Sequence, residues 1–243
     1  KGFAESNPLS DLNGNDSAAK IRILSALAFN KKISNNTILV EGIQNINLSD
    51  ILYSKELGYK IKLLSISELN NNTLFERVHP CLVPKNSFLG SIDGVLNAIV
   101  VDGLPVGKSV LQGEGAGPGP TTSALISDLC SVLRGNIKYP FGISLKSTKK
   151  VSYFNRLNHY SSSYIRLEVD DLPGVLSSIT KAFAKNKISI KNLIQNPDKK
   201  NKKAVIIIIT HESLEKNYKN LLSNLNRNKF LNKKPTFIRI ESI

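Results

Sequence analysis

Two charged side chains near the start of the sequence have a spacing that suits proton transfer. Asp16 and Lys20 lie four residues apart, so on a helix they share one face, one turn from each other. The turn expected at residues 13–15 would place the Asp16 carboxylate at the positive end of the helix dipole. A lysine beside that carboxylate, partly desolvated in a cleft, can serve as a proton carrier. The alternative is a capped helix whose solvated ion pair contributes little.

A glycine-rich segment, residues 112–121, is the second candidate for a ligand contact. Its four glycines would let the backbone approach a ligand closely, and the helix expected after it would offer its N-terminus to an anion. Pro118 and Pro120 interrupt any dinucleotide-binding fingerprint, which also requires a following βαβ unit with an acidic residue about 20 positions further on. A structural glycine-rich turn is the alternative.

The other residues that act as bases or metal ligands elsewhere give no positive signal. Cys81 and Cys130 have no metal-ligand spacing and cannot build a disulfide scaffold. His79, between a strand and a proline turn, is typical of a structural hydrogen-bonding residue, and His211 lacks the second histidine of a zinc helix. We therefore expect no metal site.

Composition narrows the classes of protein to which the chain can belong. With 243 residues, 41% of them hydrophobic, the chain has room for one large domain or two modest ones. No apolar run approaches the roughly 20 residues of a membrane span, and no secretory signal is present, so a cytoplasmic location is expected. The net charge of +14 is concentrated in residues 151–243, which hold 17 basic and 7 acidic residues. The densest basic run, residues 198–203, contains no aromatic residue, which favours a solvated turn over nucleic-acid binding.

Alternating helix and strand patterns predict a mixed α/β domain over residues 1–146. The helix that carries Asp16 would have Ile21, Leu24 and Leu27 on its apolar face. Ser49-Asp50 is a helix cap signal and Asp102-Gly103 a hairpin turn signal. The predicted strands are 36–43, 59–66, 75–83, 94–101 and 104–111, and the predicted helices are 16–29, 49–57 and 121–133, the last opened by Pro120.

The second part of the chain has a clearer pattern. The polar residues 147–162 are interpreted as a linker, and residues 163–243 predict a ferredoxin-like βαββαβ domain. Pro173 would stand near the first position of one helix, and Ser213 would cap the other. The predicted strands are 164–169, 188–194, 204–210 and 236–240. The fold class is therefore α/β (α+β), a mixed-sheet domain followed by a ferredoxin-like domain.

Ordered motifs along residues 1–135 resemble the homoserine dehydrogenase family. The opening Gly2-Phe3-Ala4-Glu5-Ser6-Asn7-Pro8 is followed by the turn Asp11-Leu12-Asn13-Gly14-Asn15-Asp16 and by Ala18-Ala19-Lys20. Arg77-Val78-His79-Pro80 and Gly115-Ala116-Gly117 fit the same family in the same order. Two departures are Asn7, where the family usually shows Asp, and Pro118-Gly119, which replaces a more variable pair.

The resemblance implies a reaction and a role for each matching residue. The family interconverts L-homoserine and L-aspartate 4-semialdehyde with NAD or NADP, in the biosynthesis of threonine, methionine and isoleucine. By resemblance, Lys20 is the proton donor and acceptor, and Glu5 and Asp16 bind the substrate. Gly2 and Gly117 would line the nicotinamide cofactor.

The second part of the chain, residues 163–243, resembles an ACT domain, an amino-acid-sensing module, through the segment Asp170-Asp171-Leu172-Pro173-Gly174-Val175-Leu176. By resemblance, Asp171, Leu172, Pro173 and Gly174 bind an effector, for which threonine is the expectation, and the protein forms a homodimer or a higher homo-oligomer. Members of the family begin with a dinucleotide-binding domain that this chain does not contain. We therefore expect the chain to be a fragment with little activity of its own.

Two other classes of function compete with this interpretation. One is a non-catalytic amino-acid-binding and dimerisation module left over from a dehydrogenase, and the other is a basic nucleic-acid-binding protein. A degenerate remnant has no reason to keep Glu5, Asp16 and Lys20 together, and all three are present. The dehydrogenase interpretation is therefore preferred.

Overall fold

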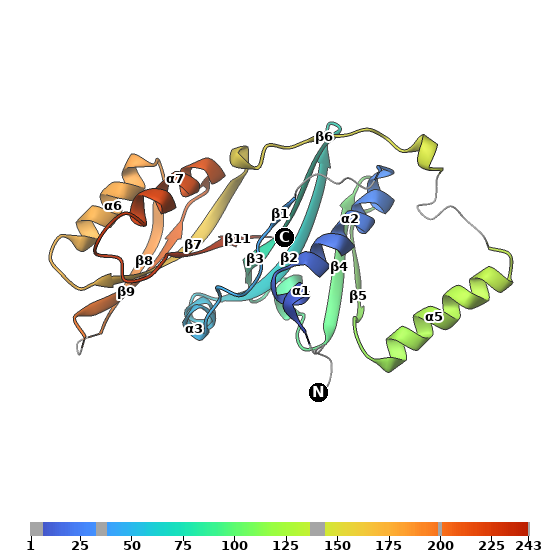
Figure 1. The fold of residues 1–243 in the computed structure, drawn as a ribbon, viewed down its shortest axis with the longest axis horizontal. Helices are drawn as coiled ribbons and strands as arrows, with labels where there is room; N and C mark the ends of the chain where they lie inside the picture. The colour runs from blue at the N-terminus through green and yellow to red at the C-terminus, as the bar shows by residue number, and fades with distance from the viewer. Residues whose placement is uncertain (1–6, 33–37, 137–143, 199–200, 243) are drawn as a thin grey trace.

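The computed structural model describes residues 7–32, 38–136, 144–198 and 201–242, and the structural statements that follow concern these residues. Figure 1 shows an N-terminal half with the long hairpin β2–β3 and a C-terminal half with two helices above a sheet. The N-terminal half contains α1 (Leu9–Leu12), α2 (Asn15–Phe29), β1 (Leu39–Val40), α3 (Leu48–Glu56), β2 (Tyr59–Asn70), β3 (Thr73–Pro84), α4 (Phe88–Ser91), β4 (Leu96–Gly103), β5 (Gly107–Glu114) and α5 (Pro118–Leu133). Between the halves lie η1 (Leu145–Ser147), β6 (Ser152–Tyr153) and η2 (Arg156–Asn158). The C-terminal half contains β7 (Tyr160–Asp170), α6 (Val175–Lys185), β8 (Ile190–Asp198), β9 (Lys203–Thr210), β10 (Ser213–Leu214), α7 (Glu215–Leu225) and β11 (Thr236–Ile240).

Strand β3 is the centre of the main sheet in the N-terminal half. Strand β2 runs antiparallel to β3 along its whole length, from Tyr59 opposite Pro84 to Asn70 opposite Thr73. On the other edge of β3, the short strands β6, β1 and β11 follow one another, and each is parallel to it. The interior residues of β3 are all buried, as expected for a strand covered on both faces.

The C-terminal half has the predicted βαββαβ order. Its four main strands stand in the order β11-β7-β9-β8, and all neighbours are antiparallel. Helices α6 and α7 cover one face, where Ile179, Phe183 and Leu221 pack against strand residues such as Ile165 and Ile206. This arrangement confirms the ferredoxin-like sandwich.

Strand β11 joins the two halves into one sheet. It pairs antiparallel with β7 in the C-terminal half and parallel with β3 in the N-terminal half. On the face opposite α6 and α7, Tyr53 and Leu57 from α3 and its C-cap pack against Tyr164 and Leu82. The two halves therefore share a core as well as a sheet.

Several local predictions are wrong in their details. The cap of α3 is Asn47 rather than Ser49-Asp50, because Asp50 reaches back to the Asn47 amide while its own amide donates to Asn47 Oδ1. The β4–β5 turn lies at residues 104–106, since Asp102 and Gly103 still pair with β5.

Three helix starts also differ from the prediction. Helix α5 begins at Pro118, two residues before Pro120. Ser213 belongs to β10, so α7 starts at Glu215, and the Ser213 hydroxyl accepts a hydrogen bond from Asn217 instead of capping the backbone. Pro173 precedes Gly174, which is the N-cap of α6, so the proline stands just outside the helix.

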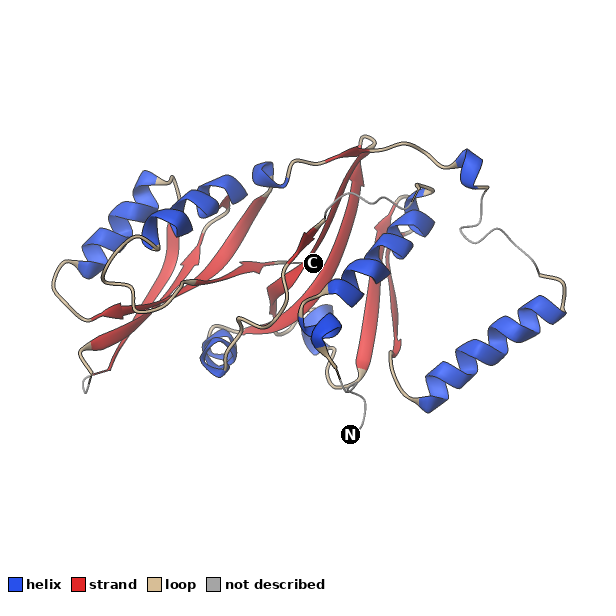
Figure 2. Cartoon of the chain, in the orientation of Figure 1, coloured by secondary structure: helices blue, strands red, loops and turns tan. Residues whose placement is uncertain are grey.

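A large apolar surface in the N-terminal half has no partner among the described residues. None of the residues of α5 is buried, and Figure 2 shows this helix standing apart from the strands. In α2, only Ile21 of the predicted apolar face is buried, and Leu24 and Leu27 stay exposed. The reason is that the helix packs on β3 through Ala18 and Ile21. None of the described helices combines the length and hydrophobicity that crossing a membrane requires.

Candidate active site at the start of α2

The turn before α2 is built by three small or polar residues. The Asn13 side-chain oxygen accepts a hydrogen bond from the Asn15 amide at 3.0 Å. Gly14 is the N-cap of α2 and has φ +83°, a left-handed conformation that glycine adopts without strain. Its carbonyl accepts the first helical hydrogen bond, from the Ala18 amide. The turn therefore fixes where α2 begins and places Asp16 in its first turn.

Asp16 and Lys20 form the ion pair that their spacing predicts. The Lys20 Nζ lies 2.6 Å from Asp16 Oδ2, and the two side chains keep 70% and 38% of their area exposed. The described residues therefore do not enclose Lys20 in a cleft. An exposed pair of this kind contributes little to folding, at most about 1 kcal/mol. What the pair does offer is an ammonium held near the Asp16 carboxylate with open access for a ligand.

The helix that carries this pair is anchored to the central strand. Ala18 and Ile21 are buried against Val78 of β3. At the N-cap, a Cβ on Gly14 would meet the Val40 and Val78 side chains at 3.2 and 3.4 Å. The close packing leaves little freedom for α2 to shift, so β3 sets the position of the backbone from which Lys20 projects.

Two predicted ligand residues cannot be placed relative to this pair. Gly2 and Glu5 lie outside the described residues. Gly117 lies at the end of the glycine-rich segment, just before α5, and its φ of +119° with ψ 162° belongs to a region reserved for glycine. Its carbonyl accepts a 2.8 Å hydrogen bond from the Thr121 hydroxyl, which ties the loop to the first turn of α5. The glycine-rich segment thus runs from the end of β5 through a turn at residues 115–117 into α5, and Gly115 in this turn packs against the Asn97 side chain.

The predicted effector residues form one exposed turn in the C-terminal half. Asp171, Leu172, Pro173 and Gly174 link β7 to α6, and all four are exposed. Gln195 of β8 donates a 3.1 Å side-chain hydrogen bond to Asp171 Oδ1. Gln195 was not identified from the sequence, because a single glutamine in a polar strand carries no signal for such a contact.

Buried ion pairs link the two halves, and sequence reasoning did not find them. Asp50 of α3 receives hydrogen bonds from Arg166 of β7 at 2.6 and 3.2 Å and from the Tyr164 hydroxyl at 3.1 Å. Arg239 of β11 contacts Glu41 at 2.7 and 3.2 Å and also binds Glu215 of α7. The partners are far apart in sequence, so no local pattern indicates these contacts.

Burial and nearby charges shift the pKa values of Arg239 and His79. Burial alone would lower the pKa of the Arg239 guanidinium, but the hydrogen bonds to Glu41 and Glu215 raise it above its ordinary value. Burial, and next the charge of Arg239, lowers the pKa of His79 well below 6.5. His79 Nδ1 lies 3.1 Å from Cys81 Sγ, and His79 Nε2 is buried without a hydrogen-bond partner.

His79, Cys81 and Glu241 bring three metal-binding atoms within 4.8 Å of one another. Burial raises the pKa of the Cys81 thiol well above its ordinary value. Arg77 and Arg239 act on the same groups with positive charge. The cluster is therefore unfavourable for a cation.

The chain matches known proteins along its whole length. The homoserine dehydrogenase family profile matches residues 1–130, and the ACT domain profile matches residues 163–230. Homoserine dehydrogenases of Neisseria gonorrhoeae and Helicobacter pylori are 34% and 36% identical to it, over 100% and 99% of this chain and 57% of each relative. The chain thus spans about half the length of the curated relatives it matches.

Solved structures agree with these sequence matches. The crystal structure of a homoserine dehydrogenase from Thiobacillus denitrificans superposes with a TM-score of 0.86 at 33% identity, over 98% of this chain and 56% of that one. A homoserine dehydrogenase from S. aureus gives a TM-score of 0.64 at 27% identity, over 100% of this chain and 55% of that one. With the ion pair on α2, the βαββαβ half and these matches, the chain belongs to the homoserine dehydrogenase family and carries an ACT domain.

Proposed function

We propose that the protein containing this chain is an NAD(P)-dependent homoserine dehydrogenase. It would interconvert L-aspartate 4-semialdehyde and L-homoserine, a step toward threonine, methionine and isoleucine. The observation that carries the proposal is the Lys20–Asp16 pair, held at 2.6 Å on the exposed start of α2. The pair provides a directed acid in a chain whose family is defined by this reaction.

In the reducing direction, the Lys20 ammonium donates a hydrogen bond to the aldehyde oxygen of the substrate. As hydride reaches the carbonyl carbon, negative charge develops on that oxygen, and the ammonium stabilises it. Lys20 then transfers its proton to the oxygen and completes the alcohol. Asp16 orients the ammonium and, with Glu5, binds the substrate amino group. In the oxidising direction, neutral Lys20 removes the hydroxyl proton.

The glycine-rich turn supports a cofactor contact. Gly117 has a backbone conformation that a larger residue would adopt only with strain, and a Cβ at Gly113 or Gly119 would meet nothing within 4 Å. At the start of α5, Pro118 and Pro120 have no amide hydrogen and the Thr121 amide donates to the Gly117 carbonyl, so the Gly119 amide is the donor that this helix start can offer to a ligand. Gly117, together with Gly2, would lie against NAD or NADP, which supplies or accepts the hydride when bound.

Turnover by the full-length protein tests this proposal, with a matched lysine as control. Lys60 lies on β2, and Asp93 lies just after α4. They form a second solvent-accessible lysine–aspartate pair, with Lys60 Nζ 2.7 Å from Asp93 Oδ2. We expect Lys20→Met to lower kcat for homoserine oxidation about 100-fold or more, the usual scale for losing a general acid, and Lys60→Met to leave it within about twofold. Equal effects of the two substitutions would overturn the assignment of Lys20.

We also propose that the exposed turn 171–174 binds threonine. Asp171 is held by Gln195 and presents a carboxylate that can receive an amino group. The Val175 amide donates to the Leu172 carbonyl, and the next amides in the first turn of α6 can receive a carboxylate. We expect millimolar threonine to raise the melting temperature and to inhibit the full-length enzyme, and Asp171→Asn to abolish both effects. If threonine changes neither quantity, the ACT domain is structural or binds a different effector.

A homodimer or a higher homo-oligomer is proposed from the uncovered surface of the β4–β5 hairpin. Ile99, Val101 and Leu111 are large apolar side chains exposed at 40%, 49% and 65%, on strands that pair only with each other. A second copy covering this hairpin would remove them from water. Sedimentation of the full-length protein tests this. We expect a dimer or larger species that dissociates in the Val101→Asp variant, whereas a monomeric wild-type protein would contradict the proposal.

A further inference from the structure

Strand β11, the last strand of the ACT domain, enters the N-terminal half and pairs with β3, the strand against which α2 packs. In β11, Arg239 pairs with Cys81 of β3 on one edge and with Ser163 of β7 on the other. Its side chain is only 3% exposed, and its guanidinium stands 5.0 Å from the centre of the Phe237 ring. A guanidinium buried this deeply requires carboxylate partners, and each partner fixes a different part of the molecule.

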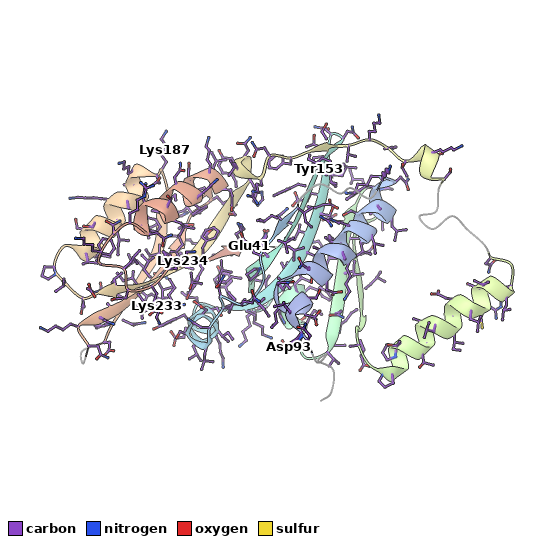
Figure 3. The ribbon with its side chains drawn as sticks, viewed as in Figure 1. Glu41, Asp93, Tyr153, Lys187, Lys233 and Lys234 are labelled. Carbon is purple, nitrogen blue, oxygen red and sulfur yellow. The ribbon has the colours of Figure 1, made fainter. Side chains whose placement is uncertain are left out.

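Glu41 is the partner in the N-terminal half, and it follows directly after β1. Both of its carboxylate oxygens accept from Arg239, at 2.7 and 3.2 Å, which is the two-pronged geometry that fixes orientation as well as distance. Figure 3 shows Glu41 in the middle of the molecule, between the two halves. The Glu41 amide also donates to the Val78 carbonyl at 2.8 Å, so backbone and side chain are both held.

The two residues after Glu41 press against the turn that begins α2. A Cβ on Gly42 would collide with the Leu12 carbonyl oxygen and with the Asn13 backbone, so the two chain segments touch without space between them. The Ile43 amide donates a 2.9 Å hydrogen bond to the same Leu12 carbonyl. Segment 41–43 is therefore a brace for the turn, and Arg239 holds one end of this brace.

The turn before α2 sets the position of the Asp16–Lys20 ion pair. Gly14 is buried, and the place of a Cβ on it lies 3.6 Å from the Glu41 carbonyl oxygen. Asp16 follows two residues later, and Lys20 lies one helical turn beyond it. A shift of segment 41–43 would therefore move the N-cap of α2 and change the direction of the Lys20 ammonium.

We propose that Arg239 is a positioning residue for the reaction: through Glu41 and segment 41–43, the ACT domain braces the turn from which Asp16 and Lys20 project. The inference rests on the proposed function for its catalytic consequence, while its structural part stands independently. Displacing a catalytic group by as little as about 1 Å can cost up to about 100-fold in rate, so a brace of this kind is measurable. Because its side chain is only 3% exposed, Arg239 would act through Glu41 rather than on the substrate or the cofactor.

The two carboxylate partners of Arg239 provide a matched pair of variants. Glu41→Gln removes the charge on the side of the turn, and Glu215→Gln removes the charge on the α7 side, inside the ACT domain. Both variants leave Arg239 with one carboxylate, so both should lower the melting temperature by similar amounts. In the full-length enzyme we expect Glu41→Gln to lower kcat about tenfold and Glu215→Gln to change it less than about twofold.

A double substitution tests whether Glu41 and Arg239 act through each other. If they do, Arg239→Met and Glu41→Gln/Arg239→Met should each lower kcat about as much as Glu41→Gln alone, because one linkage is lost once. Multiplication of the two single losses in the double variant would overturn the proposal. So would a Glu41→Gln enzyme that is folded and keeps kcat within about twofold of wild type.

Hydrogen exchange tests whether the Arg239–Glu41 contact supports the N-cap of α2, and it does so independently of the proposed function. The Ala18 amide, bonded to the Gly14 carbonyl, reports how firmly the N-cap is held. We expect peptides covering residues 14–20 to exchange faster in Glu41→Gln than in Glu215→Gln, whatever the substrate of the enzyme is. Equal exchange in the two variants would contradict the brace, whereas a wild-type protein without homoserine turnover would contradict only the function.

Discussion

The two halves of this molecule differ in how completely they bury their apolar side chains. In the C-terminal half, α6 and α7 close one face of the sheet, and Phe183, Ile179 and Leu221 are almost inaccessible to water. In the N-terminal half, α5 buries no residue, and Lys20 of α2 keeps 70% of its side chain exposed. The ACT domain thus has a closed core beneath its two helices, while the half with the candidate catalytic residues leaves surface for other contacts.

The largest effect on stability is expected from the closed core. Phe183 is 1% exposed and packs between α6 and the sheet, so Phe183→Ala should cost about 3–5 kcal/mol of unfolding free energy. Leu176 on the same helix is 37% exposed and serves as the control. Urea denaturation of residues 1–243 measures both. A loss below about 1 kcal/mol in Phe183→Ala would show that the core is less closed than its burial indicates.

The buried ion pair between the halves should give the next effect. Arg166 and Asp50 are 7% and 0% exposed, and Arg166→Met would leave the Asp50 carboxylate without its counter-charge. We expect a loss of about 3 kcal/mol, and a smaller loss in Arg166→Met/Asp50→Leu, because the double variant leaves no unpaired charge. Equal losses in the single and double variants would contradict this electrostatic explanation.

The pH dependence of stability reports on His79 at the junction. Because burial and Arg239 lower the pKa of His79 in the folded state, the unfolded chain binds its proton first as pH falls below about 6.5. Stability due to neutral His79 is therefore full above pH 6.5 and declines below it, by at most about 1.4 kcal/mol per pH unit. Unfolding of wild type and His79→Gln from pH 7 to pH 5 measures the contribution. His211→Gln, at an exposed site, is the control. Parallel wild-type and His79→Gln curves would contradict the prediction.

The smallest effect is expected in the open half. Leu129 of α5 is 54% exposed, so Leu129→Ala should change the unfolding free energy of residues 1–243 by less than about 0.5 kcal/mol. Urea denaturation under the same conditions as for Phe183→Ala makes the two directly comparable. A loss above about 2 kcal/mol would mean that α5 packs against other parts of this chain in solution.

Local patterns predicted most of the elements but few of their ends. Strand alternation and helix periodicity depend on neighbours in the sequence, so β11 and the βαββαβ order were found from them. Competing local signals explain the errors. Asn47 and Ser49 are both good caps, and only the return contact from Asp50 decides between them. Asp102-Gly103 resembles a hairpin turn, but strand pairing continues through it.

In the candidate site, too, local sequence patterns predicted only contacts between residues that are close in the sequence. Asp16 and Lys20 were found because four residues of helix separate them, and their roles came from resemblance to a family. The contact between Arg239 and Glu41 joins residues 198 positions apart, and Gln195 of β8 meets Asp171, which follows β7, although β9 lies between these two strands. Such contacts depend on which strands pair, which single-sequence periodicity does not contain. The exposure of Lys20 also follows from packing between elements rather than from the helix itself.

The most direct test of the account measures turnover and substrate binding together in the full-length protein. Wild type should oxidise homoserine with NAD or NADP, and Lys20→Ala should lose about 100-fold or more in kcat while calorimetry still detects homoserine binding. That result would assign proton transfer to Lys20 and the dehydrogenase reaction to the protein. A Lys20→Ala enzyme with full activity, or a wild-type protein that binds threonine but never oxidises homoserine, would contradict the account and favour a non-catalytic amino-acid-binding module.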